Sequence, residues 1–389
     1  MSSSMLTRTQ VLFAGICSLV LAMGIARFAY TPLLPIMMTE AALTHAGGGW
    51  LAAINYAGYL MGVLVASSIG DTKLKDRLYR WGMVVAVIST AMMAITTDFT
   101  IWALSRWIAG LSSAAGLMLG SGLILNWLIR QHHRSELGIH FSGIGLGIAV
   151  CSAAAVLMTH HVAWDIQWMV LACLGGLLLI PALVWFPPPP IDDAIQKQHP
   201  SMQHAPPNAK FMHLFTAAYF CAGFGYVVTA TFIVAIINAV PVLENRGSWV
   251  FLMIGLIAAP SCIIWDLVAR KIGDVNALII AAGLEVVGII FPVLGLGLIG
   301  AMIGAILYGA TAIAIVSLTL TMAGRYYPAQ PAKMMGKMTL AYGIAQMIAP
   351  AITGWLASMQ GGYEMGFYIA AGLMAIGTIL FYLMRKAQS

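Results

Sequence analysis

The feature that most constrains this chain is a series of apolar segments, each suited to cross a lipid bilayer. A spanning helix needs about 20 predominantly apolar residues. Twelve such segments occur, with approximate bounds 11–37, 50–69, 81–95, 99–128, 138–159, 164–186, 211–240, 247–268, 275–296, 298–322, 338–357 and 366–384. Backbone polar groups in lipid must be paired within the protein, so we expect each segment to be a helix. The sequence therefore predicts an all-α integral membrane protein.

The composition excludes a water-soluble protein. Only 8% of the 389 residues are charged, whereas 61% are hydrophobic. An ordinary soluble domain carries about a quarter of charged residues. A soluble fold of this size could not cover its surface with so few charges, but lipid tails solvate apolar side chains directly. The lipid bilayer is therefore an expected partner of this chain.

Several other functional classes lack their sequence signals. The net charge of +6 comes from short basic clusters between apolar segments, so we expect no nucleic-acid binding. The five cysteines lie inside apolar segments without the paired spacing of a metal site. No phosphate-binding glycine loop, nucleophile elbow or zinc-protease pair occurs. We expect no metal, no cofactor and no enzymatic activity.

One polar interruption divides the twelve segments into two sets of six. Residues 187–210 open with four prolines, continue through several charged residues and lack the apolar periodicity of a helix. Such a segment is typical of a linker. We expect an N-terminal six-helix bundle over residues 1–186, a cytoplasmic linker over 187–210 and a C-terminal six-helix bundle over 211–389.

The basic residues predict the orientation. With the N-terminus inside the cell, sixteen of the nineteen Lys and Arg residues fall in cytoplasmic loops and only Arg246 in an outer loop. Basic residues prefer the cytoplasmic side of a membrane. The first apolar segment is too long for the core of a signal peptide, so we expect it to be a permanent span. The sequence predicts a multi-pass inner-membrane protein with both termini in the cytoplasm.

The two halves also resemble each other at a nearly constant offset. Phe28-Ala29-Tyr30 in the first segment matches Phe224-Gly225-Tyr226 in the seventh, and Trp50 matches Trp249. These offsets are close to half the chain length, which indicates a duplicated six-helix unit. Transporters built from such repeats bind their solutes between the repeats.

Two arginines lie inside predicted spans, where a charged side chain has the highest free-energy cost of membrane insertion. Arg27 is roughly 16 Å and Arg106 roughly 12 Å from the outer end of its segment, at about 1.5 Å per residue. Both guanidinium groups can therefore occupy one layer of the membrane, where each costs about 2.5–3.5 kcal/mol. Arginine binds carboxylate or phosphate through a fixed fork of donors, which favours an anionic solute. The alternative is that each arginine bonds to a helix carbonyl or hydroxyl and fixes packing.

Polar and aromatic residues at helical spacing are the further candidates for solute binding. They share faces of the first, second, seventh, tenth and eleventh segments, because residues three or four apart are neighbours on a helix. Tyrosine suits a half-wet cavity, since it joins an apolar ring to one polar tip. Aromatic packing between helices is the alternative for any single tyrosine. The candidates are Tyr30, Thr31, Asn55, Tyr59, Tyr219, Tyr226, Tyr308, Thr311, Tyr342 and Gln346.

Glu285 is the one acidic residue deep within a predicted span. A carboxyl group in an apolar surrounding is a candidate for reversible protonation. We therefore treat Glu285 as a candidate proton-coupling residue. The alternative is a hydrogen-bonded structural role, because its segment would be peripheral in the fold named below.

Several motifs resemble those of the major facilitator superfamily. The run RWIAG, from Arg106 to Gly110, is similar to the fourth-helix motif of that family. The loop from Gly70-Asp71 to Arg77 resembles its 2–3 loop motif, with Ser67 at the leading glycine position. The equivalent 8–9 loop carries Asp266, Arg270 and Lys271. The runs GIARFAYTPLLPIM and SGIGLGIA are similar to the YbfB/YjiJ branch, and the resemblance covers essentially the whole chain.

This resemblance implies twelve transmembrane helices in two six-helix bundles, a central cavity and alternating access, usually driven by protons. Arg106 matches the motif arginine that is linked to coupling. Asp71 and Asp266 match gate residues that pair with basic side chains, here Arg77 and Arg270. No substrate follows from the resemblance.

We expect a secondary active transporter of a small organic solute, with protons as the coupling ion and an anionic solute favoured, acting as a monomer. Uptake and efflux stay open. A non-transporting membrane receptor or scaffold with the same fold is the alternative, and flux measurements separate the two.

Overall fold

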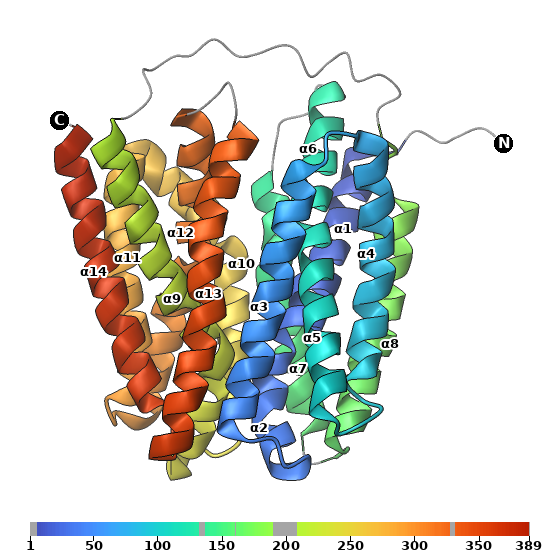
Figure 1. Cartoon of the computed structure of the whole chain (residues 1–389), viewed down its shortest axis with the longest axis vertical. Coiled ribbons are helices and arrows are strands. Elements are labelled where there is room, and N and C mark those ends of the chain that lie inside the picture. Colours follow the sequence, from blue (N-terminus) through green and yellow to red (C-terminus); the bar gives the residue numbers. More distant parts are fainter. Residues whose placement is uncertain (1–5, 132–136, 160, 190–207, 327–330, 389) are drawn as a thin grey trace.

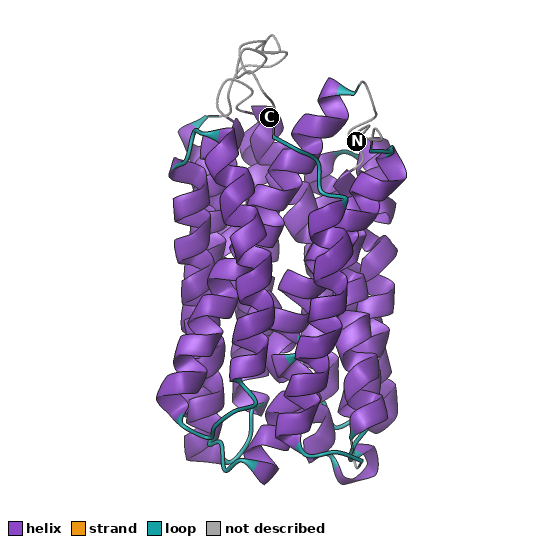
Figure 2. Cartoon of the chain, turned by 90° about the vertical axis from the view of Figure 1, so that its right-hand side faces the viewer, coloured by secondary structure: helices purple, strands orange, loops and turns teal. Residues whose placement is uncertain are grey.

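The computed structural model describes residues 6–131, 137–159, 161–189, 208–326 and 331–388. Within these residues every regular element is a helix, and Figure 2 shows the helices running along the long axis of the molecule. Figure 1 shows the helices of the first half on one side and those of the second half on the other. The start of α1 and the end of α14 lie at the same end, which we call the terminal end. The opposite end is the distal end.

The first half contains six spans. Span 1 consists of α1 (Arg8–Leu19), the π-helix η1 (Val20–Phe28) and α2 (Tyr30–Glu40). Spans 2 and 3 are α3 (His45–Ser68) and α4 (Thr72–Met92). Span 4 consists of α5 (Phe99–Ala114), the π-helix η2 (Ala115–Gly120) and α6 (Ser121–Arg130), and spans 5 and 6 are α7 (Leu137–Met158) and α8 (Trp164–Val184).

The second half contains the other six spans. They are α9 (Ala209–Ala239), α10 (Gly247–Ile272), α11 (Asp274–Ile290), α12 (Gly297–Tyr326), α13 (Pro331–Gln360) and α14 (Glu364–Gln388), with short 3₁₀ turns η4 (Pro241–Leu243) and η5 (Phe291–Val293). Twelve helical spans in two bundles confirm the predicted fold class. Most of the predicted linker 187–210 lies outside the described residues.

Span 3 differs most from its predicted bounds. We expected it to begin near residue 81, but α4 begins at Thr72, because the Asp71 side chain accepts a hydrogen bond from Lys73 N and caps the helix. Among the described helices, eleven spans are long and apolar enough to cross a membrane, and α4 is absent from that set. Its charged first turns, which include Arg77 and Arg80, extend the helix beyond its apolar part.

The closely spaced segments 275–296 and 298–322 are two separate helices, as the sequence predicts. The chain turns between η5 and α12, where Gly295 and Gly297 adopt φ values of +72° and +55°. Glycine adopts this left-handed backbone conformation without the steric cost of a Cβ atom. The two glycines therefore allow the sharp turn between α11 and α12.

The helix of span 1 is not regular. In η1 the backbone hydrogen bonds span five residues instead of the four of an α-helix. For example, Ala29 N donates to Gly24 O at 2.8 Å. π-Helical segments are rare and occur frequently at functional sites. Here the wide turn ends at Phe28, directly after Arg27, whereas the sequence alone predicted a continuous helix.

The two halves meet along two seams. In one, α3 packs against α13, and a Cβ atom added at Gly49 would lie 2.8 Å from Gly354 Cα. In the other, α7 packs against α10, and a Cβ atom at Gly145 would lie 2.7 Å from Ala259 Cα. Small residues in membrane helices allow such close backbone approach. The site described next lies between these seams, on residues from both halves.

Candidate functional site

Arg27 lies at the end of η1 and is held by aromatic rings of α3. Its side chain is buried, and its Cζ atom is 4.3 Å from the ring centres of both Tyr56 and Tyr59. The Tyr59 hydroxyl is also a hydrogen-bonding neighbour of the guanidinium. A guanidinium over an aromatic ring is attracted to the negative face of that ring. The rings stabilise this cation without neutralising its charge.

Arg106 on α5 is bound in a different way. Its Nη1 donates to Ala26 O at 3.0 Å and its Nη2 donates to Arg27 O at 3.2 Å, while the Tyr30 ring centre lies 4.6 Å from Cζ. The two carbonyls belong to the end of the π-helix η1. Arg106 therefore adopts the geometry of the packing alternative, and it fixes the backbone that carries Arg27.

Neither arginine forms an ion pair with a carboxylate within the part of the chain that the structure describes. The ion pairs found there are Arg80 with Asp76 at 3.0 Å and Arg270 with Asp266 at 2.6 Å. A buried charge without a counter-ion is costly. Arg27 is thus a buried cation whose charge is free to attract an anion.

The second half contributes a cluster of tyrosines opposite Arg27. The rings of Tyr219 and Tyr342 stack at 4.4 Å, and Tyr226 lies 5.8 Å from Tyr342 and 6.2 Å from Tyr308. Gly223 on α9 makes room for this packing, because a Cβ atom there would lie 2.7 Å from Tyr342 O. The cluster joins α9, α12 and α13 into one aromatic wall.

The cation and the aromatic wall are neighbours across the two halves. Tyr226 interacts electrostatically with Arg27, Tyr56 and Tyr59. Tyr219 interacts in the same way with Tyr59. The structure thus brings Arg27 and Tyr59 of the first half together with Tyr219, Tyr226 and Tyr342 of the second.

Several buried polar atoms around this cluster have no hydrogen-bond partner. They are Arg27 Nε, Arg106 Nε, Asn55 Oδ1, Tyr342 OH, Gln346 Oε1 and Glu285 Oε1. Buried polar groups are nearly always paired with protein or water, so a cluster of unpaired ones needs an explanation. These atoms are therefore candidate contacts for a solute or for water.

Glu285 lies on α11 behind the aromatic wall. Its side chain is buried, and it interacts electrostatically with Tyr226, Tyr308 and Tyr342. Tyr226 is thus an electrostatic neighbour of both Arg27 in the first half and Glu285 in the second.

Three predicted binding residues already have protein partners. Tyr30 donates from its hydroxyl to Gly48 O at 2.9 Å, and Thr311 donates to Leu307 O at 2.7 Å on its own helix. Thr31 donates to Ala230 O on α9 at 2.5 Å and so connects the two halves. In this conformation these hydroxyls serve packing.

Asn55 bonds to the backbone of α5, and its neighbour Tyr56 contacts Arg27. Asn55 Nδ2 donates to Arg106 O at 2.8 Å, which ties α3 to α5. Sequence reasoning paired Asn55 with Tyr59 and missed Tyr56. The signal was present, because Tyr56 and Tyr59 are three residues apart and lie on the same face of a helix.

The predicted gate residues have local partners at the terminal end. Asp71 caps α4, Arg77 is exposed, and Asp266 pairs with Arg270 one turn later on α10. None of these described contacts crosses between the halves. Their gating role stays a prediction.

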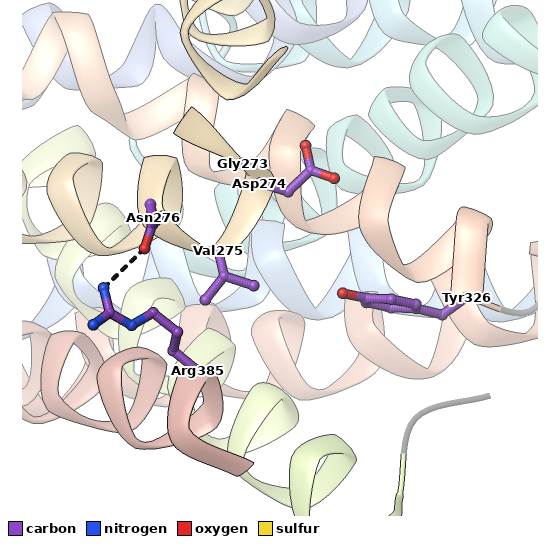
Figure 3. Close-up of a pocket in the computed structure, with 6 residues that line it drawn as sticks. All are labelled: Gly273, Asp274, Val275, Asn276, Tyr326 and Arg385. Carbon is purple, nitrogen blue, oxygen red and sulfur yellow. Dashed lines mark hydrogen bonds between the residues drawn. The ribbon is translucent and has the colours of Figure 1, made fainter. Parts of the chain in front are cut away.

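A separate pocket lies at the terminal end of the second half (Figure 3). It has a volume of about 250 Å³ and is lined by Gly273, Asp274, Val275, Asn276, Tyr326 and Arg385. Arg385 Nη1 donates to Asn276 Oδ1 at 3.0 Å. None of the predicted solute-binding residues lines this pocket.

Among solved structures, the fold is similar to that of known transporters. The nucleoside transporter NupG matches with a TM-score of 0.73 and 14% identity, covering 97% of this chain and 99% of that one. A bacterial homologue of the human lysosomal transporter Spinster, in an inward-facing and occupied conformation, matches with a TM-score of 0.69 and 16% identity, covering 98% and 97%. At these identities the likeness concerns the fold alone.

Curated relatives match parts of the chain. The niacin transporter NiaP of Acinetobacter baylyi is 26% identical over 40% of this chain and 33% of its own length. The MFS-type transporter YceJ of Bacillus subtilis is 27% identical over 25% of each chain. The chain thus matches a quarter to a third of the length of these relatives.

One family matches nearly the whole chain. Its description is "Uncharacterised MFS-type transporter YbfB", and the match covers residues 19–382. This range includes both halves of the molecule and every residue of the site around Arg27 and Glu285. The chain belongs to this YbfB-type family of major facilitator superfamily transporters.

Proposed function

We propose that this chain is a proton-coupled carrier of a small organic anion, with Arg27 as the residue that attracts the anionic group. The observation that carries the proposal is a buried guanidinium held between Tyr56 and Tyr59, with no carboxylate partner in the described part of the chain. An ionisable residue inside a membrane span is costly and is usually functional. The sequence relative named for niacin supports a small organic solute.

Binding requires the two halves to move. The predicted solute-binding residues are at most 6% exposed, so the site is closed to solvent in this conformation. We propose that residues 1–186 and 211–389 act as two bodies, connected by the segment 187–210, which separate along the seams α3–α13 and α7–α10. One chain supplies both sides of the site, which supports a monomer as the working unit.

The orientation rests on the basic residues. Lys73, Arg77, Arg270 and Arg385 belong to helix ends at the terminal end of the molecule. Since basic loops prefer the cytoplasmic side, we propose that the terminal end faces the cytoplasm of an inner membrane. Asp71 with Arg77 and Asp266 with Arg270 then belong to the cytoplasmic gate.

Coupling to protons is assigned to Glu285 and Arg106. Tyr226 interacts with both Glu285 and Arg27, so a change in the charge of Glu285 alters the field at the anion site. Arg106 donates to the carbonyl of Arg27, so movement of Arg27 is transmitted to α5. Protonation and anion binding are thereby linked through contacts on both sides of Arg27.

Flux into proteoliposomes tests this proposal. The panel is radiolabelled lactate, succinate and benzoate as anions and uridine as a neutral solute, with an imposed pH gradient of either sign. We expect gradient-dependent flux of at least one anion that disappears in Arg27→Gln. Protein-free liposomes correct for weak acids that cross the lipid unaided, and Arg246→Gln is the matched variant of an exposed loop arginine. Flux restricted to uridine, or equal anion flux in Arg27→Gln, would contradict the proposal.

A further inference from the structure

The surroundings of Arg27 also define which anion fits. We infer that the ligand of this site is a planar aromatic monocarboxylate, whose carboxylate binds the edge of Arg27 and whose ring lies against the tyrosines of the second half. This inference rests on the proposed function, since it names the substrate class of the same site. Three independent observations carry it.

The first observation concerns the number of charges. Two arginines are buried in this layer, but Nη1 and Nη2 of Arg106 already donate to Ala26 O and Arg27 O. Both arginines have an unpartnered Nε and no carboxylate among the described residues, but Arg27 makes no such bond to a carbonyl. One guanidinium is therefore not committed to the backbone, which matches one negative charge. A dianion would leave its second charge buried without a partner.

The second observation concerns geometry. The rings of Tyr56 and Tyr59 contact the guanidinium over their faces, each 4.3 Å from Cζ. The N–H donors of a guanidinium point outward in its own plane, where they bind carboxylates through two parallel hydrogen bonds. The unpartnered Nε is one of these donors. A carboxylate that binds there lies in the guanidinium plane, and so does a ring conjugated with it.

The third observation concerns the aromatic wall near Arg27. Tyr226 interacts electrostatically with Arg27, and its ring lies 5.8 Å from Tyr342, which stacks on Tyr219 at 4.4 Å. Aromatic rings prefer other rings at such spacings over saturated carbon. The wall therefore favours a flat, unsaturated body over an aliphatic one of the same volume.

The same wall offers a polar contact to the ring of the ligand. The hydroxyl of Tyr342 is buried and has no partner, whereas the hydroxyl of Tyr308 donates to Tyr226 O at 2.7 Å. One turn further along α13, Gln346 Oε1 is also unpartnered. A ring nitrogen on the ligand could accept a hydrogen bond from the Tyr342 hydroxyl, and a ring hydroxyl could in addition donate to Gln346 Oε1. Ligands with such an atom should bind more tightly than benzoate.

Matched ligands test the inference on the purified full-length chain in lipid nanodiscs, by isothermal titration. The probes are benzoate, 4-hydroxybenzoate and nicotinate, with cyclohexanecarboxylate as the saturated counterpart and benzamide as the neutral one. We expect the aromatic acids to bind, cyclohexanecarboxylate to bind about tenfold more weakly, and benzamide not to bind. Arg27→Lys keeps the charge but loses the fork, so it should weaken benzoate at least tenfold.

The outcomes separate the inference from the proposed function. If cyclohexanecarboxylate binds as well as benzoate, or if only aliphatic anions bind, the aromatic class is wrong and the anion carrier stands. If benzamide binds as well as benzoate, both the substrate class and the anionic proposal are wrong. If none of the aromatic acids binds to folded protein, the inference is overturned.

Tyr342→Phe provides a second variant that does not depend on removing a buried charge. It deletes the unpartnered hydroxyl and keeps the ring that stacks on Tyr219. We expect an unchanged melting temperature, and we expect the affinity for 4-hydroxybenzoate or nicotinate to fall several-fold more than the affinity for benzoate, which cannot bond to the hydroxyl. Equal affinities of the variant and the parent for all three acids would contradict the placement of the ligand ring at Tyr342.

Discussion

Spans 1 and 7 occupy matching positions in the two halves, yet they differ at the centre of the site. The repeat that aligns Phe28-Ala29-Tyr30 with Phe224-Gly225-Tyr226 places Arg27 opposite Gly223. Span 1 contains the π-helix η1 at this point, whereas α9 is a continuous α-helix from Ala209 to Ala239. The first half therefore carries a cation at this position. The second half carries a glycine, and Tyr342 packs against it.

The duplication therefore accounts for the matching helix positions of the two halves, but the residues at the site are not symmetric. Gly223 accepts Tyr342 because it lacks a Cβ atom, and Arg27 needs the rings of Tyr56 and Tyr59 because it carries a charge into the membrane. Each half has one role in the proposed carrier: charge recognition in the first and ring contact in the second. The following predictions test this division of roles.

The largest effect is expected from Arg27→Gln. Loss of the one available cation leaves the anion buried and unpaired, which costs about 3 kcal/mol or more. A loss of about 3 kcal/mol in binding free energy corresponds to an anion affinity at least about 100-fold lower. Titration measures the affinity, and thermal unfolding should show little net loss of stability, because removing an unpaired buried charge offsets the loss of the two cation–π contacts. A large drop in melting temperature would instead assign Arg27 to packing.

Arg106→Gln should show the reverse pattern. Its guanidinium donates two hydrogen bonds to the carbonyls of Ala26 and Arg27, and each charged hydrogen bond contributes about 1.5 kcal/mol or more. We expect the free energy of unfolding to fall by about 3 kcal/mol, measured as lower resistance to denaturant in detergent. If the variant keeps full stability but loses anion binding, the roles of the two arginines are exchanged.

Glu285→Gln should separate transport from coupling. Glutamine resembles the protonated carboxyl and cannot release a proton, so anion exchange at equal pH should continue. A gradient of one pH unit drives about tenfold accumulation for one coupled proton, and this accumulation should vanish in the variant. Paired exchange and accumulation assays on the same proteoliposomes measure both. Undiminished accumulation would remove Glu285 from the coupling mechanism.

The smallest effect is expected from Tyr56→Leu. The change removes one of the two rings at 4.3 Å from the Arg27 guanidinium, and a cation–π contact contributes about 1 kcal/mol. We expect anion affinity to fall about fivefold, with Tyr56→Phe as the matched control that keeps the ring. If Tyr56→Phe weakens binding as strongly as Tyr56→Leu, the hydroxyl and not the ring holds Arg27.

The sequence was sufficient for the architecture, because twelve apolar segments and a single polar interruption leave few other folds. It also located Arg27 and Arg106 in one layer, since depth along a helix follows from residue number alone. It could not show that Arg106 binds the carbonyls of η1, because partners on other helices depend on how the helices rotate against one another. The π-helix also rotates every residue that follows it around the helix axis. No local sequence pattern predicted this rotation.

The tyrosines illustrate the same limit in the second half. Helical spacing grouped Tyr219 with Tyr226 and Tyr342 with Gln346, but the stacking of Tyr219 on Tyr342 joins α9 to α13 and is not a local contact. Thr31 was grouped with Arg27 by spacing, yet its hydroxyl bonds to Ala230 across the interface. Sequence spacing identifies the residues that share one face of a helix. The packing of the helices determines which residues that face contacts.

The glycine contact between α3 and α13 has a consequence for the proposed separation of the two halves. Gly49 and Gly354 touch through bare backbone, so separating them there breaks no ion pair and frees no trapped side chain. In the described residues the hydrogen bonds that join the halves nearby are Thr31 to Ala230 and Tyr363 to Met38. If the halves separate as proposed, opening the α3–α13 seam at this point exchanges backbone packing and two hydrogen bonds, and it requires no buried charge to be exposed.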